Sequence, residues 1–279
     1  MAMKLPTYSN VNSYISEANS REAPNQSRPM TLNVVGVGEE MLFLIVLLPL
    51  AMVRQQSLAE SKTVVGDMPA KIQKDIIDKH NAIRRSVKPT ASNMLKMTWD
   101  PKASETAKKW VSKCKEGISP AEERIVDGIY CGENVYQSTT PTSWENIIQY
   151  WGTKASNFRY RIGPVGDLNG SDIYTQLIWY NSHRVGCAAA VCKDQLTPFR
   201  YICHYCPAGN RKPLMRTPYK AGRPCEACPN SCENKLCTNS CKYADRITDC
   251  DVLLGMSSCS EELMKTNCKA TCTCKTEIK

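Results

Sequence analysis

The first 113 residues of this 279-residue chain contain no cysteine, although the chain has sixteen. Six cysteines lie between Cys114 and Cys206 and ten between Cys225 and Cys274. The even number in each group indicates pairing within the group. Cysteines at this density persist as disulfides outside the cytosol, because cytosolic reductants keep thiols reduced. The sequence therefore predicts a secreted, extracellular protein with two disulfide-bonded parts.

No apolar run is long enough to cross a membrane. The best candidate, Leu42–Val53, is shorter than the roughly twenty residues that a spanning helix needs. A start at Met41 makes this run the apolar region of a signal peptide over 41–59, ending at a small-x-small cleavage site. Residues 1–40 are then a gene-model extension or disordered. The alternative is a signal anchor that holds the protein on a membrane.

Runs of basic residues interleaved with aromatics are also missing, which argues against a nucleic-acid partner. The net charge is +9, and residues 60–224 carry 25 basic against 15 acidic side chains. This surplus favours contact with anionic glycans or membrane surfaces, and a solvated basic surface explains it equally well.

Helical spacing appears in three segments. Ile72, Ile76 and Ile83 share one face of a run that begins near Pro69 and stops at Pro89. An Ala- and Lys-rich run over 103–114 predicts a second helix. A third is predicted to begin at an N-cap at Thr142 or Ser143 and to bury a stripe ending at Trp151.

Extended segments complete a mixed pattern. Residues 94–99 predict a short strand or extended segment, and β-rich composition predicts strands over 174–180 and 199–205, with residues 185–191 between them. Helices mixed with strands favour a three-layer α/β/α packing. A Pro- and Gly-rich linker follows Tyr205, and then ten cysteines fall within about fifty residues. A segment of that size lacks a sufficient apolar core, so its disulfides must stabilise it, at roughly 2–4 kcal/mol each.

Several motifs occur in order along the chain: His80-Asn81, Cys131-Gly132-Glu133-Asn134-Val135-Tyr136, Tyr174-Thr175-Gln176-Leu177-Ile178-Trp179, and Tyr201-Ile202-Cys203-His204-Tyr205-Cys206-Pro207-Ala208-Gly209-Asn210. With the sixteen cysteines they resemble the mammalian cysteine-rich secretory proteins (CRISP) of the CAP superfamily (SCP/PR-1/antigen 5). The resemblance implies an α+β fold with a CAP sandwich over 69–207. A linker and disulfide hinge over 208–240 and a helical ShK-toxin-like domain over 241–274 would follow.

The resemblance also implies which cysteines pair, whereas spacing alone leaves about fifteen pairings for six cysteines. The implied pairs are Cys114–Cys192, Cys131–Cys206, Cys187–Cys203, Cys225–Cys232, Cys228–Cys237, Cys241–Cys274, Cys250–Cys268 and Cys259–Cys272. The alternative interpretation of Cys203-x-x-Cys206 and Cys225-x-x-Cys228 is a zinc site. The spacing suits zinc, but cysteines of a secreted protein are expected to form disulfides instead.

Relatives carry a cleft of two histidines and two glutamates, where some bind a divalent metal. The resemblance places Ile118 and Ile173 at the histidine positions and Lys154 at one glutamate position, and only Glu133 is kept. Two isoleucines and an ammonium cannot complete a four-ligand shell. We therefore expect no metal, no cofactor and no catalytic residue here, and Lys154 is expected to pair with Glu133.

Other polar residues have ordinary interpretations. His80 is expected to be a structural hydrogen-bonding group, His183 to lie in a turn, and His204 to be a packed or solvent-facing ring. Asn169-Gly170-Ser171 is a glycosylation sequon.

The expected function is recognition rather than chemistry. The resemblance implies a non-enzymatic effector of sperm maturation and gamete interaction, or a regulator of ion channels through the cysteine-rich module. Its partners would be membrane proteins or ion channels and sperm or egg surface proteins, with Lys242 and Tyr243 as the candidate lysine-plus-aromatic pair. A metal-dependent hydrolase or protease and a sterol or lipid carrier are the alternatives.

Overall fold

The computed structural model describes residues 64–65, 68–166, 170–193, 195–247 and 249–279. The proposed signal segment over 41–59, residues 1–40 and the sequon residue Asn169 lie outside the described residues. The helices are α2 (Ala70–Arg85), α3 (Pro101–Val111), α4 (Trp144–Thr153), α5 (Ser171–Leu177), α6 (Cys250–Leu254), α7 (Glu262–Asn267) and α8 (Lys269–Thr273). None of the helices in the described ranges is long and apolar enough to span a membrane.

A five-stranded sheet forms the centre of the first domain. Its order is β1-β8-β9-β5, with antiparallel pairing along this path, and β2 pairs in parallel with β8. These strands are β1 (Val64–Val65), β2 (Thr98–Trp99), β5 (Gly132–Ser138), β8 (Arg184–Val191) and β9 (Phe199–Cys206). Short two-stranded ladders join β3 (Ile125–Val126) to β4 (Ile129–Tyr130), β6 (Phe158–Arg159) to β7 (Gly163–Pro164), and β10 (Cys232–Glu233) to β11 (Leu236–Cys237).

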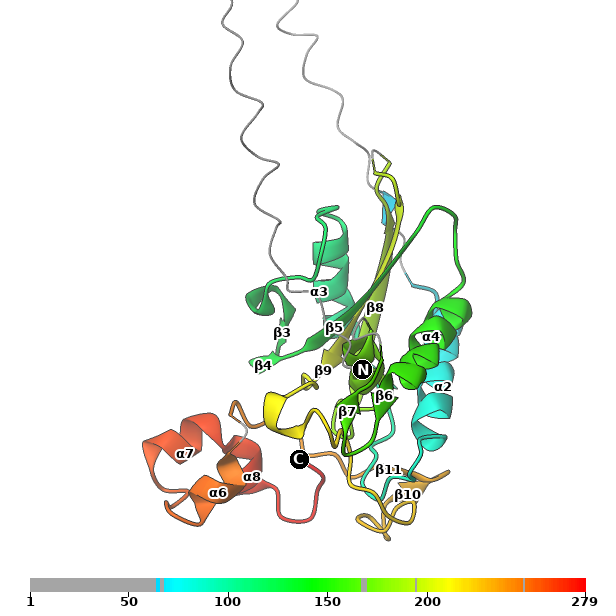
Figure 1. Cartoon of the computed structure of the whole chain (residues 1–279). Coiled ribbons are helices and arrows are strands. Elements are labelled where there is room, and N and C mark those ends of the chain that lie inside the picture. The colour runs from blue at the N-terminus through cyan, green and yellow to red at the C-terminus, as the bar shows by residue number, and fades with distance from the viewer. Residues whose placement is uncertain (1–63, 66–67, 167–169, 194, 248) are drawn as a thin grey trace, which may run out of the picture. The chain divides into compact units, whose positions relative to one another are not determined.

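Alternate residues of the sheet enter two different cores. Tyr201, Cys203 and Tyr205 of β9 join the core formed with α2, α4 and α5, whereas Ile202 packs with α3. This follows from the two-residue period of a strand, which sends neighbouring side chains to opposite faces. Figure 1 shows α3 on one side of β8 and β9, with α2 and α4 on the other. The predicted α/β/α layering is confirmed.

Local capping explains where two predicted helices begin. The Asp100 carboxylate accepts hydrogen bonds from Lys102 N at 2.9 Å and Ala103 N at 3.2 Å, and Pro101 occupies the first turn of α3. At α4 the Ser143 hydroxyl accepts from Asn146 N at 3.3 Å. Both side chains satisfy amides that have no partner within the helix. The helix expected from Pro69 is confirmed as α2.

The predicted strand over 174–180 is wrong, because residues 171–177 form α5. Tyr, Thr, Ile and Trp favour strands in isolation, but the tertiary environment overrides this preference. Thr175, Gln176 and Leu177 are all buried, so the segment shows no polar face from which a helical period could be read. The segment over 94–99 is mostly extended and pairs only at Thr98–Trp99.

Arg84 of α2 is 1 % exposed and was not singled out from the sequence. Its guanidinium group donates five hydrogen bonds of 2.8–3.0 Å to backbone carbonyls, those of Leu95, Leu177, Trp179 and Tyr180. No side chain other than Arg offers five donors in a rigid planar group. Arg84 therefore joins α2 to the segment at Leu95 and to the end of α5 with the loop that follows it.

The hinge packs on the first domain. Cys237 N donates to Met94 O and Lys96 N donates to Cys237 O, both at 2.8 Å. Tyr219 and Leu236 are part of the same buried core as α2 and α4. The linker and hinge thus extend the first domain's core.

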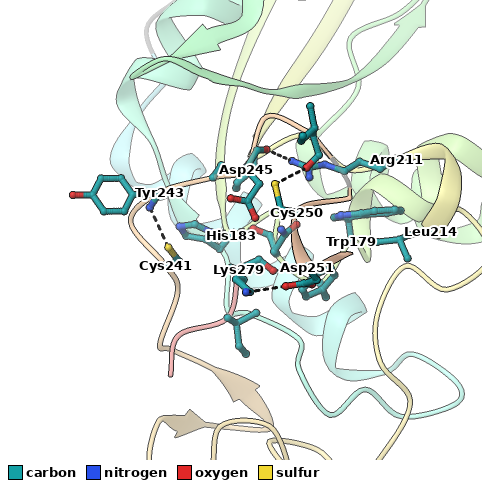
Figure 2. A pocket seen from close by; sticks show the side chains of 16 residues that line it. Trp179, His183, Arg211, Leu214, Cys241, Tyr243, Asp245, Cys250, Asp251 and Lys279 are labelled. Carbon is teal, nitrogen blue, oxygen red and sulfur yellow. Dashed lines mark hydrogen bonds and ion pairs between the residues drawn. The ribbon is translucent and has the colours of Figure 1, made fainter. Parts of the chain in front are cut away.

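The structure contains the eight disulfides that the resemblance implies, and the described residues include no free cysteine. Three of them fix the short helices α6–α8 of the cysteine-rich module. Tyr180 Oη donates to Lys279 O at 2.6 Å, and Arg211 Nη2 donates to Asp245 O at 2.8 Å. The module is therefore held to the first domain at both ends (Figure 2).

Candidate functional site

Glu133 is the one acidic residue kept from the expected cleft, and it lies in a closed hydrogen-bond network. It sits on β5 directly opposite His204 of β9. One carboxylate oxygen accepts from Ser119 N at 2.7 Å, and the other accepts from Ser119 Oγ at 2.6 Å and lies 2.7 Å from His204 Nε2. The side chains of Glu133 and His204 are both fully buried. The carboxylate thus has no face open to a ligand.

These contacts fix the ionisation of Glu133. Burial alone would raise its pKa, but the hydrogen bonds from His204 and Ser119 favour the carboxylate and bring the pKa below its ordinary value. The other nitrogen of His204 lies 2.8 Å from Thr106 Oγ1, which donates to Ala103 O at 2.9 Å. Thr106 is therefore a link between α3 and the sheet, and it is not poised as a nucleophile.

The other three cleft positions do not join Glu133. Ile118 is 66 % exposed, and Ile173 packs against the core while its carbonyl accepts from Asn134 Nδ2 at 3.0 Å. The Lys154 ammonium lies 4.5 Å from the centre of the Tyr150 ring. The expected pairing of Lys154 with Glu133 is wrong, because Ser119 and His204 already occupy both carboxylate oxygens.

The residues present do not fit a metal at this cleft. Isoleucine side chains have no lone pairs, an ammonium repels a cation, and the buried carboxylate is already engaged by Ser119 and His204. In the described part of the chain, the metal-type cluster of three donors is Cys225, Cys228 and Cys237. All three are in disulfides, as are Cys203 and Cys206, so the zinc alternative is also wrong.

A basic aromatic cluster on the module is the second candidate site. The ammonium groups of Lys242 and Lys269 lie 5.0 and 4.4 Å from the centre of the Tyr243 ring. Both lysines are exposed, and the Tyr243 ring packs against the disulfide Cys241–Cys274. The structure brings the predicted Lys242–Tyr243 pair together. It adds Lys269, which sequence reasoning missed because it lies 26 positions after Tyr243 in the chain.

Two family models match this chain over the two domains just described. The model named "Cysteine-rich secretory protein family" (CAP) matches residues 77–205, and the model named "Crisp" matches residues 225–279. The chain carries a CAP domain followed by a Crisp domain. The Crisp match spans both the hinge and the helical module. This domain make-up fits a secreted, non-enzymatic protein.

Solved structures are similar to the CAP part. NaASP2 with Zn²⁺ has a TM-score of 0.50 at 24 % identity, with 61 % of this chain and 97 % of that chain covered. Na-ASP-1 has a TM-score of 0.50 at 25 % identity, covering 66 % of this chain and 50 % of that one. The hookworm platelet inhibitor has a TM-score of 0.50 at 20 % identity, covering 65 % and 96 %. These similarities support the CAP fold.

The residues at the cleft lead to a prediction about zinc binding. Calorimetric titration of the purified chain with Zn²⁺ is expected to show no stoichiometric binding at the cleft, because two of the four expected ligand positions carry isoleucine and a third carries lysine. Tight one-to-one binding by the unaltered chain that Glu133→Gln removes would contradict this prediction.

Proposed function

We propose that this chain is a secreted, non-enzymatic effector that recognises cell-surface proteins through its Crisp domain. The observation that carries the proposal is the Tyr243 ring placed between Lys242 and Lys269 on a module fixed by disulfides. A side chain held before binding loses little entropy when it meets a partner. Cations beside an aromatic ring suit a partner that presents carbonyl or carboxylate groups.

The partner class rests on the resemblance to mammalian cysteine-rich secretory proteins. It favours ion channels and sperm or egg surface proteins, with roles in sperm maturation and gamete interaction. The closed network at Glu133 supports a non-enzymatic role, because it leaves no free base or metal ligand in the cleft.

Binding and current recordings test the proposal directly. The labelled secreted chain is applied to sperm, and whole-cell currents are recorded in parallel. A variant with Lys242→Gln and Tyr243→Leu is expected to bind at least about tenfold more weakly, because both contacts are removed. The control is Lys275→Gln, which removes an exposed lysine elsewhere on the module. Equal binding and equal currents for the two variants would refute recognition through this cluster.

A sterol or lipid carrier is a second candidate, favoured by a groove of about 530 Å³ on the CAP domain. Ile83, Phe158, Tyr174 and Tyr219 line it, and Lys79 and Lys88 also lie along it. Apolar walls with a few polar groups are typical of small-molecule sites. Organic extraction of the purified protein followed by mass spectrometry decides between an occupied and an empty groove.

A further inference from the structure

A basic pocket of about 480 Å³ lies where the CAP domain meets the Crisp domain. From the CAP domain and the linker that follows it, the pocket is lined by the β3–β4 hairpin, Arg184, Ala208 and Arg211. From the Crisp domain it is lined by residues 242–246, Thr266 and Lys269. Five of the lining side chains are cationic and two, Asp127 and Asp245, are anionic.

Both acidic groups are held by their own neighbours, Asp127 in ion pairs and Asp245 in hydrogen bonds. Asp127 Oδ1 lies 2.5 Å from Lys102 Nζ, and its second oxygen lies 3.4 Å from Arg184. The two oxygens of Asp245 accept from Thr271 N at 3.0 Å and Thr271 Oγ1 at 2.7 Å. Neither carboxylate is therefore free to pair with the remaining cations of the pocket.

Three of the five cations are left over for a ligand. Arg184 is 2.9 Å from Asp100, and Arg211 donates to the Asp245 carbonyl. By contrast, the described residues place no carboxylate within ion-pair distance of Lys242, Arg246 or Lys269, which are all exposed. Unpaired cations around a concave surface raise the local positive potential and attract anions.

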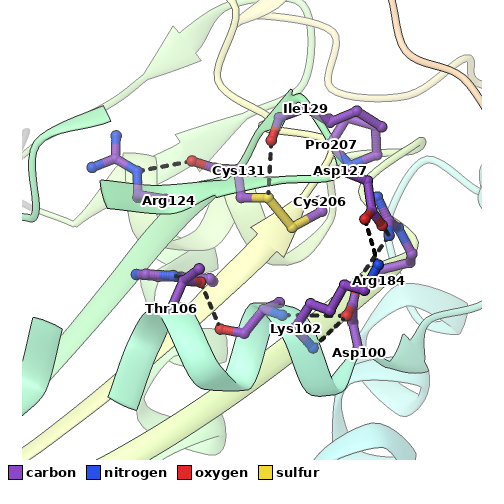
Figure 3. The surroundings of a disulfide bond; sticks show 12 residues. Asp100, Lys102, Thr106, Arg124, Asp127, Ile129, Cys131, Arg184, Cys206 and Pro207 are labelled. Carbon is purple, nitrogen blue, oxygen red and sulfur yellow. Dashed lines mark hydrogen bonds and ion pairs between the residues drawn. A yellow bond between two sulfur atoms is a disulfide. The ribbon is translucent and has the colours of Figure 1, made fainter. Parts of the chain in front are cut away.

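The walls of the pocket are fixed before any ligand arrives. The disulfide Cys131–Cys206 ties the end of the β3–β4 hairpin to β9, and the ion pairs of Asp127 lie beside it (Figure 3). Ala208 N donates to Tyr130 O at 2.8 Å, which holds the 48 %-exposed Tyr130 at the pocket. On the opposite side Arg211 reaches Asp245 (Figure 2).

We propose that this pocket binds a sulfated glycan, with Lys242, Arg246 and Lys269 pairing with sulfate groups and Tyr130 and Tyr243 contacting sugar rings. Tyrosines beside cations fit a ligand that alternates flat apolar ring faces with anions. A membrane surface fits less well, because the lining includes no strongly exposed aliphatic side chain that could enter a bilayer. The inference rests on the proposed recognition of cell-surface proteins and names a sulfated glycan carried at the cell surface as the group that the pocket binds.

The test measures binding of a heparin octasaccharide to the secreted chain by calorimetry. A variant with Lys242→Gln and Lys269→Gln is expected to bind about tenfold more weakly, and binding by the unaltered chain is expected to weaken as salt is raised. The control, Lys71→Gln with Lys193→Gln, removes the same charge from exposed sites outside the pocket and is expected to bind normally. Desulfated octasaccharide is expected not to bind.

Two outcomes would overturn the inference. An equal loss in both double variants would mean that diffuse surface charge attracts the glycan. Binding to phosphatidylserine vesicles but not to the octasaccharide, with loss in the pocket variant, would assign the pocket to lipid headgroups. The sperm and current assays use Lys242→Gln with Tyr243→Leu. Glycan binding without any cellular effect would therefore refute the proposed function and leave the pocket intact.

Discussion

Replacing Arg84 by methionine is expected to lower the free energy of unfolding by about 3 to 6 kcal/mol. The guanidinium group is buried, and its five hydrogen bonds end on four carbonyl groups, those of Leu95, Leu177, Trp179 and Tyr180. Methionine fills much of the same volume but donates nothing, so these carbonyls lose their donors inside the protein. A buried acceptor without a partner costs about 1–3 kcal/mol.

Chemical denaturation of the oxidised protein measures this effect. The matched control is Arg85→Met, the next residue of α2, which is half-buried. We expect the control to change the unfolding free energy by less than about 1 kcal/mol. Arg84→Lys is expected to fall between the two, because an ammonium has three donors and no planar fork. Similar stabilities for the Arg84→Met and Arg85→Met variants would contradict a structural role for Arg84.

Acidification from pH 7.5 to 5.0 is expected to cost about 2 kcal/mol for each of two buried histidines. Burial lowers the pKa of His80 and of His183 to about 4, from an ordinary value of 6.5. The native state therefore favours neutral rings. Their contribution to stability is fully present above pH 6.5, and it is lost as the pH falls from 6.5 toward 4, where the unfolded chain binds protons and the native chain does not.

Hydrogen bonds define which tautomer the neutral His80 ring adopts. Its Nδ1 lies 2.7 Å from Ile76 O and its Nε2 lies 3.0 Å from Tyr205 Oη. The first contact requires a proton on Nδ1, and the second lets the tyrosine hydroxyl donate to Nε2. Protonating Nε2 would remove that acceptor within a site that also contains Arg84.

Denaturation curves at the two pH values test the assignment. His80→Gln is expected to be less stable at pH 7.5, and its stability is expected to fall about 2 kcal/mol less on acidification than that of the unaltered chain. The comparison uses the change in unfolding free energy between the two pH values. A variant that is equally less stable at both values would therefore not give this result. If the unfolding free energy of the variant changed with pH as much as that of the unaltered chain, His80 would not contribute to the pH dependence.

Local sequence was sufficient for the elements whose signal is local. The helices α2, α3 and α4 have one apolar face each, and Asp100 and Ser143 mark two of their starts, so periodicity and capping residues identify them. The helix α5 was mistaken for a strand, because Thr175, Gln176 and Leu177 are all buried and the surrounding core, rather than propensity, selects their conformation.

For the candidate sites, too, the sequence identified some residues but not their contacts. The motif around Glu133 identified the acidic residue, but Ser119 and His204 reach it only through the register of β5 with β9. Lys154 was expected beside Glu133 on the basis of alignment, whereas its position at the end of α4 places it over Tyr150. Side-chain partners depend on packing, and packing is not readable from spacing alone.

The sequence by itself determined that sixteen cysteines divide six and ten and that the chain pairs an α/β domain with a small cysteine-rich module. These features depend on residue identity and on short-range order. Only the tertiary structure decided that Arg84 joins three segments, that Glu133 is closed off by Ser119 and His204, and that Lys242, Arg246 and Lys269 line a pocket with Tyr130. Those contacts join residues far apart in the chain, and the packing of the sheet, the hinge and the disulfides places them together.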